Sequence, residues 1–364
     1  MDSSPVSPRP LPRARQGGVA LVLVLWAGAL ISVIAAAFAF SVRTEVRLAT
    51  AAVERAQAGA LANAGVDRAV LGLLERNAAG RWQGDGRVYE FALASGVVRV
   101  VARAETGRID INYAPRDLLV GLVESAIRTG IGTASGVEDG REESASPEAA
   151  PDAAHVADAI MDWRDGNDRR RLHGAEDADY RQADLPRGAG DRRFLSVSEL
   201  AQVLGVTPEL YAAIAPLATV YGTGPRVDAA YADRGVLAAI PGLDLAAVDD
   251  FIIERDVILA DAVAADTDLR VAQRQIQGLA RKLGSRAPKY LVAGRAAVYT
   301  VFSQGRLPSG AVAVRRAVVR LSRARGRAYR VYSWSETASF PDTGAADPDP
   351  EPRGEIVGAL PGTS

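Results

Sequence analysis

The longest apolar stretch of the chain lies close to its beginning. Residues 19–40, VALVLVLWAGALISVIAAAFAF, include no charged side chain. A helix rises 1.5 Å per residue, so about 20 such residues cross the hydrocarbon core of a bilayer. The apolar part of a cleaved secretory signal is shorter, at about 7–15 residues. Because Arg9, Arg13 and Arg15 precede the stretch, we predict a membrane span with its amino end in the cytoplasm.

The helical pattern continues beyond the apolar stretch. Residues 42–76 contain no proline, and small or apolar side chains recur at alternating spacings of three and four. We therefore predict one helix of about 50 residues or more, which ends near Asn77. Gly59 and Gly65 allow another helix or a sheet to approach it closely. An ordinary signal anchor followed by a juxtamembrane helix is the alternative. The predicted packing face consists of Val46, Ala49, Val53, Ala56 and Ala60.

Apolar and polar residues alternate with a period of two in two distant parts of the chain. Such alternation, broken by short Gly-containing connections, is typical of antiparallel strands with one buried face. A long helix followed by strands, with more strands after a gap, predicts an α+β domain interrupted by an insertion. The predicted strands are 88–94, 96–105 and 107–114, then 297–305, 311–323 and 328–334.

The insertion, roughly 116–285, is predominantly helical in pattern and contains a linker of small and acidic residues at 130–154. Two of its helix–turn–helix segments have turns at Gly205 and Gly242. They resemble the helix-hairpin-helix of DNA-binding proteins, whose turn presents backbone N–H groups to a phosphate. Each turn here has a single glycine, and Asp244 stands where the phosphate would lie. We interpret the segments as SAM-like packing modules, with a membrane-anchored DNA-binding protein as the alternative.

Composition narrows the possible chemistry. The chain has no cysteine and two histidines, so disulfides, thiolate metal sites and multi-histidine zinc sites are excluded. Its net charge of -1 gives no global basic field for nucleic acid. No Gly-rich phosphate loop follows a predicted strand. We expect a protein without catalytic activity and without a nucleic-acid partner.

One segment, 158–186, concentrates carboxylates. Hard oxygen ligands gathered around a turn suit calcium, which accepts six to eight oxygens in flexible geometry. The spacing is not that of an EF-hand. The alternative is that nearby arginines neutralise the acids in a solvated loop. The carboxylates are Asp162, Asp165, Asp168, Glu176, Asp177 and Asp179; the arginines are Arg164, Arg169, Arg170 and Arg171.

The junction RQGG-VALVLVLW resembles the class III signal of type IV pilins and pseudopilins, a short basic leader that ends in glycine before an apolar helix. The resemblance implies that prepilin peptidase cleaves after Gly18, and that Val19 becomes an N-methylated amino terminus. Most pilins carry glutamate at the fifth mature position, where this chain has Leu23. In the family that glutamate pairs with the terminal ammonium of an adjacent subunit, and a buried charge without such a partner is costly.

A missing glutamate is also found in the minor pseudopilin K family of type II secretion, which this chain resembles through to its carboxyl end. The resemblance implies a pseudopilin fold, a position at the tip of the pseudopilus, and partners that include minor pseudopilins I and J and other pseudopilins. It also implies calcium in the globular part, for which we assign the ligands Asp165, Asp168, Glu176 and Asp177.

The expected location is the inner membrane of a Gram-negative bacterium, with one span and a periplasmic globular domain. The expected organisation is a cleaved leader (1–18), a transmembrane part (19–41), a periplasmic helix with the first strands (42–115), an inserted helical domain (116–285), the final strands (286–340) and a disordered tail (341–364).

Overall fold

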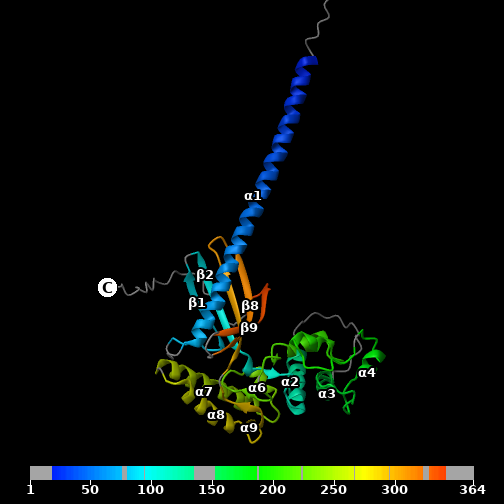
Figure 1. Ribbon diagram of the computed structural model, residues 1–364, viewed down its shortest axis with the longest axis vertical. Coiled ribbons are helices and arrows are strands. Elements are labelled where there is room, and N and C mark those ends of the chain that lie inside the picture. Colours follow the sequence, from blue (N-terminus) through cyan, green and yellow to red (C-terminus); the bar gives the residue numbers. More distant parts are fainter. Residues whose placement is uncertain are drawn as a thin grey trace, which may run out of the picture. The chain divides into compact units, whose positions relative to one another are not determined.

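The structure is a computed structural model of the chain (Figure 1). It describes residues 19–75, 80–93, 95–134, 152–186, 188–222, 224–265, 267–294, 296–322 and 328–341. The leader with Gly18, most of the predicted linker and nearly all of the predicted tail lie outside these ranges. The chain divides into two compact units, Met1–Gln57 and Ala58–Ser364, and each is described by itself.

Helix α1 spans Val19–Leu74, a length of 56 residues, so the prediction of one long helix is confirmed. Its first part is apolar and long enough to cross a membrane. Side chains there are exposed, including Leu23 at 64% and Trp26 at 74%. Exposed apolar side chains in such number are typical of helices that are covered by lipid or by another protein surface.

In the second unit, a five-stranded antiparallel sheet has the order β1-β2-β7-β8-β9. The predicted strands at both ends of the chain are thereby confirmed, apart from 107–114. Strands β2 and β7, which flank the insertion, pair from Val97↔Arg306 to Ala104↔Tyr299. The strands are β1 (Asp85–Leu93), β2 (Gly96–Ala104), β7 (Val298–Arg306), β8 (Val312–Leu321) and β9 (Tyr329–Thr337).

The last turns of α1 pack on one face of this sheet. A Cβ atom at Gly65 would overlap Ser303 Oγ and lie 2.6 Å from Val98 Cγ1. From the sheet side, a Cβ at Gly305 would lie 2.6 Å from Leu61 Cβ. Glycines on both surfaces therefore set the helix-to-sheet distance, as Gly65 led us to expect. The buried hydrophobic side chains of α1 are those of Ala58, Leu61, Ala62, Val66, Ala69, Val70 and Leu73.

A helical region separates β2 from β7 and has its own hydrophobic core. That core includes Ala287, Tyr290 and Leu291, so the helical region extends past the predicted limit at 285. Arg116 of α2 joins Asp158 of α3 through two hydrogen bonds, of 2.5 and 3.0 Å. The helices are α2 (Arg116–Ala134), α3 (Ala153–Arg164), α4 (Asp177–Gln182), α5 (Pro208–Ile214), α6 (Arg234–Ala238), α7 (Leu245–Ala264), α8 (Leu269–Lys282) and α9 (Ala287–Tyr290).

The predicted strand 107–114 is wrong. Only Ile109–Asp110 (β3) is extended, and it pairs in parallel with β4 (Ala218–Thr219) rather than with the main sheet. The carboxylate of Asp110 accepts a hydrogen bond from the Asn112 backbone N–H at 2.8 Å, and this local turn ends the strand. A second short parallel pair joins β5 (Val227–Asp228) to β6 (Leu291–Val292).

Candidate functional sites

The predicted packing face of α1 is exposed. Val46 is 59% and Val53 56% exposed, and Ala49 and Ala56 are exposed as well. Ala60 belongs to the second unit and is also exposed, whereas its neighbours Ala58, Leu61 and Ala62 face the sheet. Ala60, the member of the five that lies in the second unit, is thus not on the face of α1 that packs on the sheet. The three/four spacing of the five residues matches the seam of a coiled coil. Contact of this face with another helix stays a prediction.

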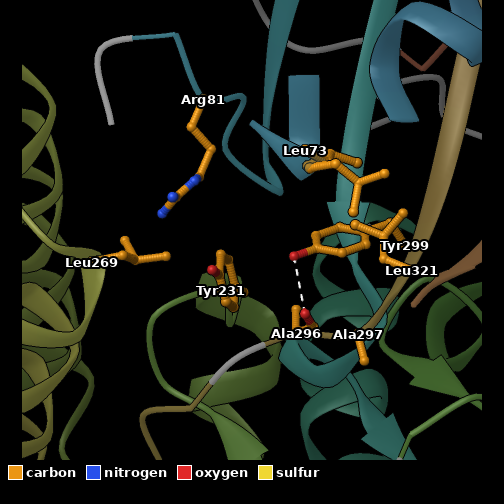
Figure 2. Close-up of a pocket in the computed structure, with 9 residues that line it drawn as sticks. Leu73, Arg81, Tyr231, Leu269, Ala296, Ala297, Tyr299 and Leu321 are labelled. Atoms are coloured by element: carbon orange, nitrogen blue, oxygen red, sulfur yellow. Dashed lines mark hydrogen bonds between the residues drawn. The ribbon is translucent and has the colours of Figure 1, made fainter. Parts of the chain in front are cut away.

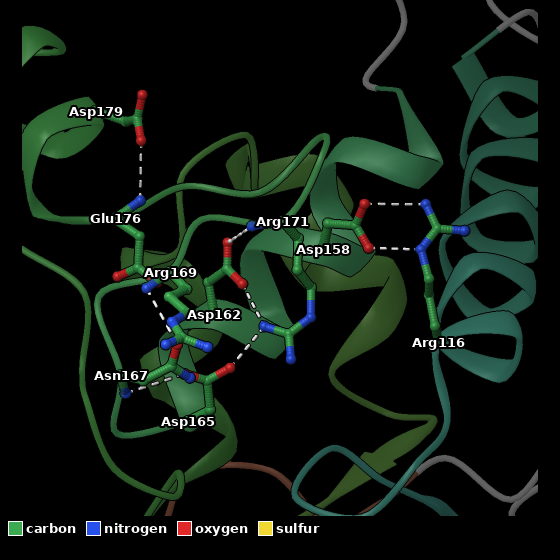
Figure 3. Close-up of polar contacts among 9 residues, drawn as sticks. All are labelled: Arg116, Asp158, Asp162, Asp165, Asn167, Arg169, Arg171, Glu176 and Asp179. Atoms are coloured by element: carbon green, nitrogen blue, oxygen red, sulfur yellow. Dashed lines mark hydrogen bonds and ion pairs between the residues drawn. The ribbon is translucent and has the colours of Figure 1, made fainter.

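The acidic segment begins within α3, which ends at Arg164. Asp162 is fully buried, and the guanidinium of Arg171 bonds both Asp162 and Asp165, the latter at 2.6 Å (Figure 3). The Arg171 backbone N–H also donates to Asp162 Oδ2 at 3.1 Å. Asn167 Nδ2 donates to Asp165 Oδ1 at 2.5 Å and holds the turn after the helix. Arg171 therefore neutralises part of the acidic segment.

Glu176 and Asp177 start helix α4. The Asp179 side chain accepts a hydrogen bond from the Glu176 N–H at 3.0 Å, which satisfies one backbone donor at the helix start (Figure 3). The side chain of Glu176 is buried, and its Oε1 atom has no hydrogen-bond partner among the described residues. Burial, and then the charges of Asp162 and Asp165, raise the pKa of Glu176 to about 7. Asp177 Oδ1 accepts from the Ala189 N–H at 3.0 Å.

The fold brings these carboxylates near one another without closing a ligand shell. Asp168 also contributes to the raised pKa of Glu176, and burial followed by Asp177, Asp168 and Asp165 raises the pKa of Asp191. In the part of the chain that the structure describes, no three His, Asp or Glu residues are placed to hold a metal ion together. Sequence reasoning did not select Asp191, because it reaches the cluster only through a returning loop.

Two glycines shape this cluster. A Cβ at Gly174 would overlap Asp162 Oδ2, and a Cβ at Gly188 would overlap Asp177 Oδ1. Only the absence of a side chain at these positions lets the two carboxylates approach the backbone. The GAED part of the acidic segment therefore has a packing role, which its composition alone did not indicate.

The helix-hairpin-helix-like turns are present at both predicted glycines. Gly205 has φ 85° and Gly242 φ 82°, a backbone conformation that glycine adopts without strain. The carboxylate of Asp244 accepts a hydrogen bond from the Ala247 N–H at 3.4 Å. A carboxylate of the chain itself thus caps α7 where a DNA phosphate would bind, and the DNA-binding alternative gains no support from this turn.

A pocket of about 190 Å³ lies at the end of α1 (Figure 2). Arg81 extends toward Tyr231 and Leu269, and the Tyr299 hydroxyl donates to the Ala296 carbonyl at 3.1 Å. The remaining lining is aliphatic: Leu73, Leu74, Ala297 and Leu321. No carboxylate, histidine, serine or threonine is among the nine residues that line this pocket, so it contains no acid–base or nucleophilic pair.

Two comparisons with known proteins match part of the chain. The family model for type II secretion system (T2SS) protein K matches residues 145–223, which include the acidic segment. A type II secretion system protein K from Escherichia coli (strain K12) is 32% identical over 68 residues, 19% of this chain and 21% of that protein. The chain therefore matches only about a fifth of this relative's length.

A solved structure has the same fold. The GspK–GspI–GspJ complex from the type 2 secretion system of enterotoxigenic Escherichia coli contains a chain that matches with a TM-score of 0.50 and 17% identity. The match covers 82% of this chain and 99% of that chain. At this identity the comparison shows the fold alone.

A long apolar amino-terminal helix whose final turns pack on an antiparallel sheet is the architecture of a pseudopilin. Between β2 and β7, the chain carries a helical region, and residues 145–223 of this region match the family model for T2SS protein K. Within the chain, residues 145–223 are similar to the type II secretion protein K family, and the fold is that of the solved GspK chain.

Proposed function

We propose that this chain is a minor pseudopilin located at the tip of the type II secretion pseudopilus, where it nucleates assembly for protein export across the outer membrane. The supporting observation is the helical region from α2 to α9, inserted between neighbouring strands of the pseudopilin sheet. An insertion of this bulk on every subunit of a helical filament would clash with its neighbours. On a subunit at the end of the filament, the insertion has free space. The role is structural rather than catalytic.

The partners are minor pseudopilins I and J. The solved relative is in a complex with GspI and GspJ, and the exposed face of Val46, Ala49, Val53, Ala56 and Ala60 offers this chain a seam for similar helices. Leu23 fits a terminal subunit, since the charge pair that glutamate makes inside a filament needs an adjacent ammonium group. Other pseudopilins then join below the tip.

Co-purification with pseudopilins I and J tests this proposal. Val46→Asp and Ala56→Asp place a charge within the seam, and both are expected to abolish recovery of the partners while the circular dichroism of the chain stays unchanged. Ala51→Asp is the matched control, because Ala51 is also small and exposed but lies on the opposite side of the helix. Equal recovery of partners with Val46→Asp and with the wild type contradicts the proposal.

Maturation and membrane placement complete the proposal. Prepilin peptidase removes the leader after Gly18, Val19 is N-methylated, and α1 anchors the chain in the inner membrane with the second unit in the periplasm. The basic leader and the apolar first part of α1 support this orientation.

The acidic segment is proposed to bind calcium through Asp165, Asp168, Glu176 and Asp177. The buried Oε1 of Glu176, which has no hydrogen-bond partner among the described residues, fits a hard, oxygen-binding cation, and Gly188 admits the carboxylate of Asp177 to the backbone. Arg171 already bonds Asp165, so calcium competes with this guanidinium for the carboxylate. Bound calcium would hold the end of α3 to the start of α4.

A further inference from the structure

Strand β9 forms one edge of the five-stranded sheet (Figure 1). It pairs with β8 on one side, and among the described residues no strand lies on its other side. A bulge leaves Tyr332 outside the pairing, whereas residues 333–337 pair one by one with residues 318–314 of β8. In such a strand the backbone N–H and C=O groups of every second residue point away from the sheet. We call the outer side of residues 333–337 the free edge of β9.

The free edge lacks the features that commonly keep natural edge strands from pairing. Proline, lysine and bulges are frequent protections of this kind, and residues 333–337, SWSET, contain neither proline nor lysine and are paired regularly. Glu336 carries the one charge of the segment. Its carboxylate lies 3.2 Å from the guanidinium of Arg315 on β8, so this charge is compensated within the sheet. The free edge is therefore open to a further strand.

Trp334 lies at the centre of the free edge and is 45% exposed. It pairs with Ala317, whose side chain belongs to the core between α1 and the sheet, so the indole lies on the sheet face toward α1. On the opposite face, the free edge presents the hydroxyl groups of Ser333, Ser335 and Thr337. A large aromatic side chain that stays open beside unpaired backbone groups is typical of the central residue of a protein interface.

As far as Pro341, the chain that follows β9 turns away from the free edge. The ring of Phe340 lies 5.3 Å from the guanidinium of Arg99, and Arg99 belongs to β2, beyond β8 and β7. Val98 faces α1, so its neighbour Arg99 faces the opposite side of the sheet. The described chain after Thr337 thus crosses the face opposite α1, toward the centre of the sheet, and does not pair with β9.

The free edge lies on the flank of α1 where the predicted seam ends. The Tyr329 hydroxyl, at the start of β9, donates to Asp67 Oδ1 at 3.4 Å. Asp67 follows Ala60 by seven residues, about two helical turns, so both side chains project from the same side of α1. A second pseudopilin whose long helix contacts α1 at Ala60 therefore brings its own sheet, which packs on that helix, to the side of β9.

We propose that the free edge of β9 accepts a strand from the sheet of a neighbouring minor pseudopilin, so that one sheet extends across two subunits. The inference rests on the proposed function, which supplies the neighbour. In strand addition, main-chain hydrogen bonds provide affinity and alternate side chains provide specificity. The partner strand places an apolar side chain beside Trp334 and small or hydroxyl side chains beside Ser333 and Ser335.

Hydrogen exchange at single residues tests for strand addition. The full chain in detergent is measured alone and with purified minor pseudopilins I and J. The partners should slow exchange of the outward-facing amides in residues 333–337 by about tenfold or more, because these amides enter a ladder. The amides of β1, the opposite edge, should not change. Binding of the partners without new protection at residues 333–337 overturns the proposal, since docking on the Trp334 side chain alone leaves the outward amides exposed.

Substitution of Trp334 measures the side-chain part of the interaction. Trp334→Ala is expected to weaken the affinity for the partners by about 30-fold or more, the size of a typical interface hot spot. Leu93→Ala is the matched control, because Leu93 is apolar and 40% exposed but ends β1 at the opposite edge of the sheet. Both variants should keep the circular dichroism of the wild type. Equal loss of affinity in the two variants contradicts binding at β9.

The remaining outcomes separate this proposal from the tip role. If Val46→Asp abolishes partner recovery while Trp334→Ala binds like the wild type, the proposed function stands and strand addition at β9 fails. If the wild type binds neither partner, both proposals fail. A dimer of the chain alone that Trp334→Ala dissociates assigns the free edge to a second copy and also overturns strand addition by a minor pseudopilin. Protection at residues 333–337 together with weaker binding by Trp334→Ala supports it.

Discussion

Gly65 of α1 lies directly against Ser303 of β7, so close that a Cβ atom at position 65 would overlap the serine hydroxyl oxygen. This contact sets how near the helix comes to the sheet. The core between them consists of small and branched side chains such as Ala62, Val98 and Val301, which fill a narrow space. A longer side chain at position 65 would hold the two layers apart.

The first prediction concerns this contact. Gly65→Ala is expected to lower the free energy of unfolding by about 1–3 kcal/mol, because overpacking forces the sheet or the helix to shift. Gly278→Ala in α8 is the matched control, since no atom lies within 4 Å of a Cβ there. Alanine has a higher helix propensity than glycine, so this replacement should stabilise the variant by up to about 1 kcal/mol. Urea unfolding in detergent measures the free energy of unfolding of both variants. Equal stability of the two variants contradicts the role of Gly65 in setting the helix-to-sheet distance.

The second prediction concerns maturation. Mass spectrometry of the chain purified from a host with prepilin peptidase should show an amino terminus at Val19 that is one methyl group heavier than the unmodified residue. Gly18→Val should leave the leader attached, because the resemblance implies a peptidase that requires glycine before the apolar helix. A wild-type chain that begins at Met1 in that host argues for an ordinary signal anchor.

The third prediction concerns the acidic segment. Calcium at about 100 times its dissociation constant should raise the free energy of unfolding by about 2.7 kcal/mol, detected as a higher melting temperature and slower proteolysis between α3 and α4. Glu176→Gln should remove most of this gain. Asp249→Asn, an exposed carboxylate of α7 that pairs with Arg234, should keep it. A melting temperature that is insensitive to calcium rejects the site.

The fourth prediction concerns pH and Asp228, whose carboxylate is buried in β5. Burial raises the pKa of Asp228 to about 7, despite hydrogen bonds from the N–H groups of Ala230 and Gly294. The folded chain therefore holds this proton more tightly than the unfolded chain, whose carboxyl has a pKa of about 3.9. The stabilisation is present below about pH 4 and is lost as pH rises through 7, with a slope approaching 1.4 kcal/mol per pH unit.

Asp228→Asn removes this titration. The melting temperature of the wild type minus that of the variant should be largest near pH 4 and should shrink by pH 8. Asp249→Asn should show the opposite trend, because the hydrogen bond from Arg234 lowers the pKa of Asp249 and its benefit is lost toward acid. A difference between wild type and Asp228→Asn that does not change with pH would show that Asp228 is ionised throughout.

Several features were predictable from local pattern. The apolar stretch and the three/four spacing predicted α1, and the period of two predicted β1, β2, β7, β8 and β9. The glycine turns at Gly205 and Gly242 were also predictable, because glycine adopts positive φ without the steric cost that a Cβ atom imposes. The strand predicted at 107–114 was wrong, because the side chain of Asp110 turns the backbone at Asn112. This hydrogen bond favours a turn over a strand for a few residues. The alternation of apolar and polar residues gives no sign of it.

The sequence by itself determined α1, the five strands of the main sheet, the helical region between β2 and β7, and the position of the acidic segment. Each of these depends on residues that are neighbours along the chain. Only the tertiary structure decided which face of α1 meets the sheet, that Arg171 bonds Asp162 and Asp165, and that Asp191 returns to the same cluster. It also decided that β9 forms an edge of the sheet and that Trp334 stays exposed there. These relationships join residues through packing and strand register, which the local pattern of a sequence does not encode.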